Sequence, residues 1–254
     1  MTTLSFVPAG AAAPRARQLV AQTRVEIELL ARNAEQLLLT IAIPTVVLVL
    51  FATAPIADLP HPRVDYLVPG VLALAVMSTA FTGQAIATGF ERRYGVLRRL
   101  GTTPMPRLVL IGAKTLAVMA VEVGQVVLLV GVGLLLGWSP TGSPLTVAGL
   151  LLLGTAAFSG LGLLLAGILR AEATLAAANL IYVVLLVLGG VVFPIADFSA
   201  GMRHVLLLLP ITALTDGLRA VLRHGASVPL RDWLTLLGWA AGSIGLASRT
   251  FRWS

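Results

Sequence analysis

Long apolar runs, interrupted by short charged segments, dominate the pattern of this chain. A helix needs about 20 mainly apolar residues to cross a hydrocarbon core of about 30 Å. Six runs reach that length, so the pattern predicts an all-α integral membrane protein with six transmembrane helices. The predicted spans are Gln36–Ala57, Tyr66–Phe90, Leu108–Gly137, Leu145–Leu169, Ala173–Pro194 and Val228–Ser248.

Turn-forming and helix-kinking residues set the limits of these spans. The uncharged run from Val123 to Leu169 is too long for one helix, and the cluster Trp138–Pro144 is rich in residues that form turns. We therefore place a loop there, between the third and fourth spans. Pro44 is expected to kink the first span without ending it, because neighbouring helices satisfy the freed carbonyl.

The basic residues indicate the orientation in the membrane. Six spans leave both termini on one side, and with that side cytoplasmic, 13 of the 18 lysines and arginines lie inside. Cytoplasmic loops carry an excess of these residues. We therefore predict a cell-membrane protein with both termini in the cytoplasm. Residues 1–254 form one transmembrane domain, with a tail and interfacial helix at 1–35, a membrane domain at 36–248 and a tail at 249–254.

Composition excludes several other classes of protein. Hydrophobic residues make up 57% of the chain and charged residues 11%, which leaves no room for a soluble catalytic domain. The net charge is +7, but the arginines are spread between the spans, so we predict no nucleic-acid partner. The chain has no cysteine, which excludes disulfides and thiolate metal sites. His61, His204 and His224 are isolated, so no metal site is predicted.

The segment before the first span is amphipathic. Its apolar residues fall roughly on one helical face and its charged residues elsewhere, which predicts an interfacial helix on the inner leaflet. A partly ordered tail is the alternative. The apolar residues are Val20, Ile27, Leu30, Ala31 and Ala34, and the charged ones are Arg24, Glu28, Arg32 and Glu35.

The segment Gly89–Pro104, between the second and third spans, has more pattern than a simple connection needs. Phe90, Tyr94 and Leu97 form an apolar stripe along a predicted rigid helix, which Thr103–Pro104 ends. Two interpretations stay open: arginines that bind anionic lipid at the inner leaflet, or a helix that docks in a cleft of a cytoplasmic partner. The arginines that point away from the stripe are Arg92, Arg93, Arg98 and Arg99, and Leu100 lies at its edge.

The third span carries two charged residues. Glu122 lies near its middle, where a charge costs at least about 2.5 kcal/mol, and Gln125 follows one turn later. Glu122 is therefore either a neutral carboxyl bonded to a neighbouring helix or, with Gln125, a polar point on a substrate path. Lys114, nearer the cytoplasmic end, is expected to extend its amine to the inner surface.

The chain has no nucleotide-binding motif of its own. A P-loop requires Gly-x-x-x-x-Gly-Lys-Ser/Thr after a strand. The nearest approach, Gly112–Thr115, has alanine before the lysine and lies at the start of a predicted membrane helix. We therefore predict no enzyme activity in this chain. ATP-driven transport would need ATP and Mg²⁺ bound by a separate subunit.

The segment between spans two and three shares a set of residues with a known family. The set is Glu91–Arg92, Gly95, Leu97, Leu100, Thr103–Pro104, Arg107, Gly112 and Lys114. It resembles the coupling-helix segment of type 2 ABC exporter permeases, which include daunorubicin-resistance-type exporters. The chain departs from that family at Tyr94, where an acidic residue is frequent, and at Val96, where threonine is frequent. The ATPase-coupling residues implied by the resemblance are Glu91, Arg92, Arg93, Tyr94, Gly95, Leu97, Arg98, Leu100, Thr103 and Pro104.

A second resemblance follows the fifth span, in Gly189–Pro194, Pro210 and Leu218–Arg219. In the family this region forms two short helices that re-enter the membrane from outside, although Ala213 departs from the family pattern. Physical length agrees, because Met202–Leu209 covers only about 12 Å as a helix. The following segment, Thr212–Arg223, is amphipathic, and Asp216 is placed to pair with Arg219.

The resemblance implies the membrane subunit of an ATP-binding cassette exporter. Two permease copies, in the bilayer, would work with two cytoplasmic ATPase subunits. Aromatic residues are only 6% of the chain, which favours an amphiphilic drug or a lipid-like substrate over sugar polymers. A proton-coupled secondary transporter that uses Glu122 is the alternative, and a passive membrane scaffold is a third hypothesis.

Overall fold

The computed structural model describes residues 12–54, 59–192, 194–195 and 198–250. Within these ranges every regular element is a helix, as the sequence predicts. The tail before residue 12, the end of the first predicted span at Ala57, Phe193 and Arg252 lie outside the described residues. The helices are α1 (Arg15–Arg32), α2 (Ala34–Thr53), α3 (Arg63–Val76), the π-helix η1 (Met77–Gly83), α4 (Gln84–Arg93), α5 (Val96–Gly101), α6 (Arg107–Leu135), α7 (Pro144–Ile168), α8 (Ala171–Leu188), α9 (Ala200–Leu206), α10 (Pro210–Leu222) and α11 (Leu230–Thr250).

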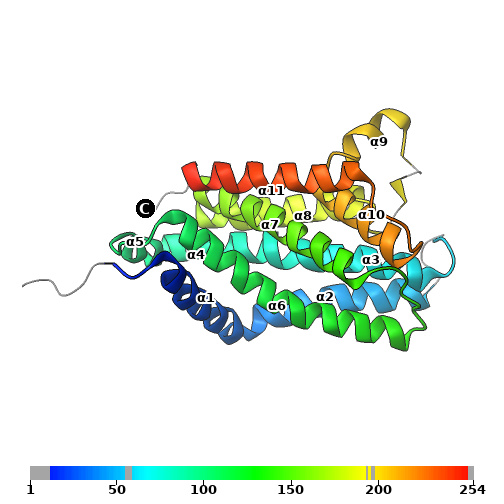
Figure 1. Cartoon of the computed structure of the whole chain (residues 1–254), viewed down its shortest axis with the longest axis horizontal. Coiled ribbons are helices and arrows are strands. Elements are labelled where there is room, and N and C mark those ends of the chain that lie inside the picture. Colours follow the sequence, from blue (N-terminus) through cyan, green and yellow to red (C-terminus); the bar gives the residue numbers. More distant parts are fainter. Residues whose placement is uncertain (1–11, 55–58, 193, 196–197, 251–254) are drawn as a thin grey trace, which may run out of the picture.

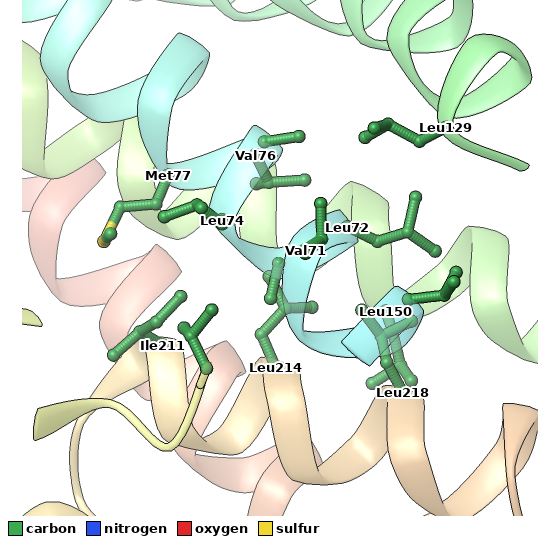
Figure 2. Close-up of a cluster of buried hydrophobic side chains, with 14 of the residues drawn as sticks. Val71, Leu72, Leu74, Val76, Met77, Leu129, Leu150, Ile211, Leu214 and Leu218 are labelled. Carbon is green, nitrogen blue, oxygen red and sulfur yellow. The ribbon is translucent and has the colours of Figure 1, made fainter. Parts of the chain in front are cut away.

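One helical body, Arg63–Arg93, forms the centre of the bundle. It joins α3, η1 and α4 without a break, and α2, α6, α7, α8 and α10 pack around it (Figure 1). Every residue of α3 from Tyr66 onward is buried, because this stretch is apolar on all sides. Figure 2 shows the core that results, with side chains of α3 meeting side chains of α6, α7 and α10. The labelled residues are Val71, Leu72, Leu74, Val76, Met77, Leu129, Leu150, Ile211, Leu214 and Leu218.

Four helices of the described residues are long and apolar enough to cross a membrane, or up to five if a bent pair counts as one span. The four are Arg63–Arg93, α6, α7 and α8, which correspond to predicted spans two to five. The helix α2 is apolar over the shorter stretch Thr40–Thr53, and α11 is not among the four. The chain is therefore a helical membrane protein, and the six-span topology stays a prediction.

The N-terminal amphipathic segment is helical over Arg15–Arg32 and lies across α6. Leu19 rests on Gly112, where a side chain would come within 3.2 Å of it. Val20, on the predicted apolar face, is 70% exposed, and the buried residue of this helix is Glu26. The face toward α6 therefore carries a carboxyl that the amphipathic pattern did not single out.

The two short helices expected before the last span are α9 and α10. They meet at a bend of 90°, as either a broken span or a re-entrant loop. Pro210 starts α10, where its missing N–H costs nothing. Helix α9 lies at one end of the bundle (Figure 1). The start of α1, the end of α11 and α5 lie together at the opposite end.

Candidate functional site

The segment between spans two and three is two helices with a turn, so the prediction of one rigid helix over Glu91–Leu100 is wrong. Helix α4 ends at Arg93, and α5 begins at Val96. The turn depends on Gly95, whose φ of 74° is a left-handed conformation that other residues rarely adopt. Tyr94 still stacks on Phe90, with ring centroids 6.2 Å apart. The change of direction at Gly95 separates this pair from Leu97.

Two of the predicted coupling arginines bind groups within the chain. Arg92 donates to the carbonyl of Gly167 at 2.8 Å and to that of Leu169. These carbonyls lie at the C-terminal end of α7, where helical carbonyls lack partners. Arg93 pairs with Glu172 in the first turn of α8. The end of α4 is therefore fixed to the connection between α7 and α8.

Helix α5 is held to the bundle mainly by its one fully buried side chain. Leu97 is fully buried and packs in a small apolar cluster with Leu110, Ile111, Leu163 and Ala247, which come from α6, α7 and α11. Its burial leaves the other faces of α5 open. We call these exposed residues the α5 surface: Tyr94, Val96, Arg98, Arg99, Thr103 and Pro104.

Leu100, at the edge of the predicted stripe, is partly buried against the same apolar cluster. Its carbonyl accepts a 2.6 Å hydrogen bond from the Thr103 hydroxyl, and that of Arg99 accepts one from Thr102 at 2.7 Å. These bonds satisfy carbonyls at the end of α5. The threonines before Pro104 therefore end the helix, as the sequence predicts.

Beside this segment lies a buried triad of charges. The Lys114 amine contacts Glu26 Oε2 at 2.9 Å and Glu91 Oε2 at 2.7 Å. The lysine side chain is only 4% exposed, so the expectation that it extends to the inner surface is wrong. Its ammonium instead joins α1, α4 and α6 in one contact. Charges this deeply buried persist only when paired.

Glu122 and Gln125 are both buried on α6, and they face different neighbours. Glu122 accepts a hydrogen bond from Thr155 of α7. The Gln125 oxygen accepts a 2.8 Å hydrogen bond from Thr79 of η1, and its amide donates to the Thr40 carbonyl of α2 at 2.8 Å. Gln125 thus has partners on two helices, which suits a packing role. Neither residue lines the cavities described below.

A cavity of about 360 Å³ lies between α2, η1 and α8. Its wall is polar and uncharged at several positions, and the hydroxyl oxygen of Thr82 is buried with no partner in the described part of the chain. Ser78 and Thr82 of this wall belong to the π-helix η1, and π-helical turns are frequent at functional sites. Sequence reasoning missed this site, although hydroxyl residues in the second span were a signal for it. The polar lining residues are Asn33, Thr40, Ser78, Thr82, Asn179 and Tyr182.

Arg219 of α10 is buried, at the end of the bundle away from α5. It donates to the carbonyls of Gly190 at 2.6 Å, Val191 at 2.9 Å and Tyr66 at 3.3 Å. Its guanidinium lies 3.8 Å from the centre of the Tyr66 ring, a cation–π contact. The expected pair with Asp216 is wrong, because the ion pair of Asp216 is with Arg231, at 3.7 Å. Backbone carbonyls, unlike carboxylates, leave no mark in the sequence.

Comparison with known proteins agrees with this architecture. A search of curated proteins found no match to the chain. A family model described as ABC-2 type transporter matches residues 17–222, from the first turn of α1 to the end of α10, with the α4–α5 segment between them. The match covers most of the chain and all but the last of the described helices. The chain therefore belongs to the ABC-2 type transporter family, whose members are the membrane components of transporters.

Proposed function

We propose that this chain is the permease subunit of an ATP-driven exporter, in which two permease copies work with two cytoplasmic ATP-binding subunits. The observation that carries the proposal is the α5 surface, which is seated on three helices through Leu97 yet open to a partner. A connecting loop needs neither property. ATP and Mg²⁺ would be bound by the partner subunit, and both termini would lie on its side of the membrane.

Force applied to the α5 surface has defined routes into the bundle. One passes from α5 through the Gly95 turn into α4, the cytoplasmic end of the central body. A second passes through Arg92 and Arg93 to the connection between α7 and α8. A third passes from Glu91 through Lys114 to α1 and α6. Closure of the ATPase subunits would therefore move several helices together.

The cavity between α2, η1 and α8 is our candidate for the substrate path. Helix α8, which lines the cavity, is mostly exposed. We place the second permease copy against α8, where it would close the cavity. A wall of hydroxyl and amide groups beside apolar helices suits an amphiphilic drug or a lipid-like molecule, because it offers hydrogen bonds without charge. The re-entrant arrangement of α9 and α10 would cover the outer end of this path.

The proposal is tested by ATP hydrolysis and transport in the assembled complex. The permease is co-expressed with a nucleotide-binding subunit from its gene neighbourhood and reconstituted in vesicles. We expect Arg98→Glu on the α5 surface to lower complex formation and coupled hydrolysis about tenfold, because a reversed charge at an interface is repelled. Arg203→Glu is the matched control, an exposed arginine on α9 at the other end of the bundle. Equal effects of the two changes would contradict the proposal.

A proton-coupled carrier is the second candidate, because Glu122 is a buried carboxyl on a membrane helix whose Oε1 has no partner among the described residues. Such groups often serve proton relays. This function predicts transport driven by a pH gradient without any ATPase and lost in Glu122→Gln. Transport that requires ATP and survives this change would reject it.

A further inference from the structure

A second crevice, of about 480 Å³, lies between α1, α4 and α6. Its rim is formed by side chains that are well exposed, such as Leu29 and Tyr94, and its base by buried ones, including Glu26 and Lys114. The crevice is thus open at one side and closed at the other. It lies apart from the uncharged cavity beside α8, and only Asn33 and Ile86 line both.

The charges at the base do not balance. The charged residues that line the crevice are Glu26, Glu91 and Lys114, which are two carboxylates around one ammonium. With all three groups ionised, the site carries a net charge of −1. A buried charge without a counterion is costly in a medium of low dielectric constant. The base of the crevice therefore favours one more positive charge, as a proton on one carboxyl or as a cationic group of a ligand that replaces this proton.

The same crevice offers hydrogen-bonding groups that nothing in the described part of the chain uses. The amide nitrogen of Gln84 and the hydroxyl oxygen of Thr88 are buried and have no partner. Both residues line the crevice from α4, and their side chains are 5% and 1% exposed. Buried polar groups are almost always satisfied by protein, water or ligand. These two groups mark a second polar contact beside the charged base.

The walls exclude a simple inorganic cation as the natural occupant. They are mostly apolar, and the stacked rings of Phe90 and Tyr94 form one side. Aromatic faces attract organic cations, and apolar walls favour ligands with a large hydrophobic part.

We propose that the crevice between α1, α4 and α6 is a binding site for a lipophilic organic cation. The cationic group lies against Glu91 and Glu26, and the hydrophobic part lies along Phe90, Tyr94 and the apolar wall. Tyr94 and Val96 belong both to the crevice and to the α5 surface, so a bound cation would contact the segment that is proposed to meet the ATPase. Binding itself requires no second subunit, so this inference stands or falls separately from the proposed function.

The test is equilibrium binding to the full chain in phosphatidylcholine nanodiscs, with two probes of the same shape and opposite charge. Tetraphenylphosphonium is expected to bind saturably, at one molecule per chain, and tetraphenylborate is not. This comparison needs only the wild-type protein. Absence of saturable phosphonium binding, or equal binding of the two probes, would overturn the proposal.

Charge variants then locate the site. Glu91→Gln and Glu26→Gln each bring the net charge to zero while keeping the side-chain size, so each should weaken phosphonium binding about tenfold or more. Lys114→Met makes the net charge −2 and should strengthen binding. Glu28→Gln, on the exposed side of α1, is the matched control and should change nothing. Unchanged affinity in both of the first two variants would place the bound cation elsewhere and reject this site.

The binding experiment is separable from the test of the exporter. Phosphonium binding by a permease whose complex with the ATPase subunit shows no coupled ATP hydrolysis would support this site and count against the proposed function. ATPase coupling without phosphonium binding would do the reverse.

Discussion

Replacement of Arg219 by methionine should destabilise the end of the bundle that carries α10. The arginine binds three backbone carbonyls, those of Gly190, Val191 and Tyr66, and lies over the Tyr66 ring. These contacts hold α10 to the end of α8 and to α3. Gly70 lets α3 approach the backbone of Val191 closely, because a Cβ at this position would lie 2.5 Å from the Val191 carbonyl oxygen. Methionine keeps much of the side-chain volume and loses every hydrogen bond.

The expected size of the effect follows from these distances. A hydrogen bond from a charged donor contributes about 1.5–3 kcal/mol to stability. The bonds at 2.6 and 2.9 Å carry most of the stabilisation, and the one at 3.3 Å is long. The desolvation cost of burying the guanidinium offsets part of the gain. We therefore expect Arg219→Met to lower the free energy of unfolding by about 3 kcal/mol.

Equilibrium unfolding in mixed micelles measures this loss. Arg223→Met is the control, because Arg223 lies farther from the Tyr66 ring, at 5.6 Å, and donates one bond of 3.2 Å to the His61 carbonyl. Its effect should stay below about 1 kcal/mol. Similar losses of unfolding free energy for the two arginine variants would refute the reasoning that the hydrogen bonds from Arg219 to backbone carbonyls stabilise this end of the bundle.

Three further changes test other parts of the structure. Gly95→Ala places a side chain in a left-handed turn with open space around it, so it should cost about 1–2 kcal/mol by backbone strain alone and lower ATPase coupling. Gly162→Ala brings a methyl group within 2.7 Å of the Phe81 carbonyl oxygen and should lower the unfolding free energy by about 2 kcal/mol, whereas Gly238→Ala, in open space inside α11, should raise it by up to about 1 kcal/mol. Glu122→Gln keeps an oxygen that can accept the hydrogen bond from the Thr155 hydroxyl of α7, so ATP-driven transport in a vesicle assay should continue near the wild-type rate. Loss of transport in this variant would favour proton coupling.

Hydropathy identified the long helices because their signal is local. The third and fourth predicted spans, Leu108–Gly137 and Leu145–Leu169, nearly coincide with α6 and α7. The short helices near Pro210 were predicted from the family resemblance, and segment length agreed with it because Met202–Leu209 is too short to cross a bilayer. Such features depend on composition within a window and on single helix-terminating residues.

The contacts of single charged residues were not predictable in the same way. Lys114 meets one carboxylate 23 residues away and another 88 residues away, and only the fold brings them together. Arg92 binds carbonyls of α7 about as far along the chain, at separations of 75 and 77 residues. A backbone acceptor has no residue type, so no pattern of the sequence points to it.

The turn at Gly95 was not predicted, although the glycine itself is a local signal for a helix break. Glycine ends or interrupts helices, and it is the one glycine between Glu91 and Leu100. The apolar stripe nevertheless favoured a continuous helix, because Phe90, Tyr94 and Leu97 recur at helical spacing. In the structure Leu97 turns inward and Tyr94 stays 71% exposed, so tertiary packing separates residues that the periodicity had grouped.

The proposed function depends most on contact between the α5 surface and an ATP-binding subunit, and cysteine crosslinking tests this contact directly. The chain has no cysteine, so Tyr94→Cys on the α5 surface gives a single reactive thiol. Leu145→Cys is the matched control, an exposed position at the start of α7, at the other end of the bundle. We predict that Tyr94→Cys crosslinks to the co-purified ATPase subunit, with a yield that changes when ATP is added, and that Leu145→Cys does not. No crosslink at Tyr94, or equal crosslinks at both positions, would contradict the account.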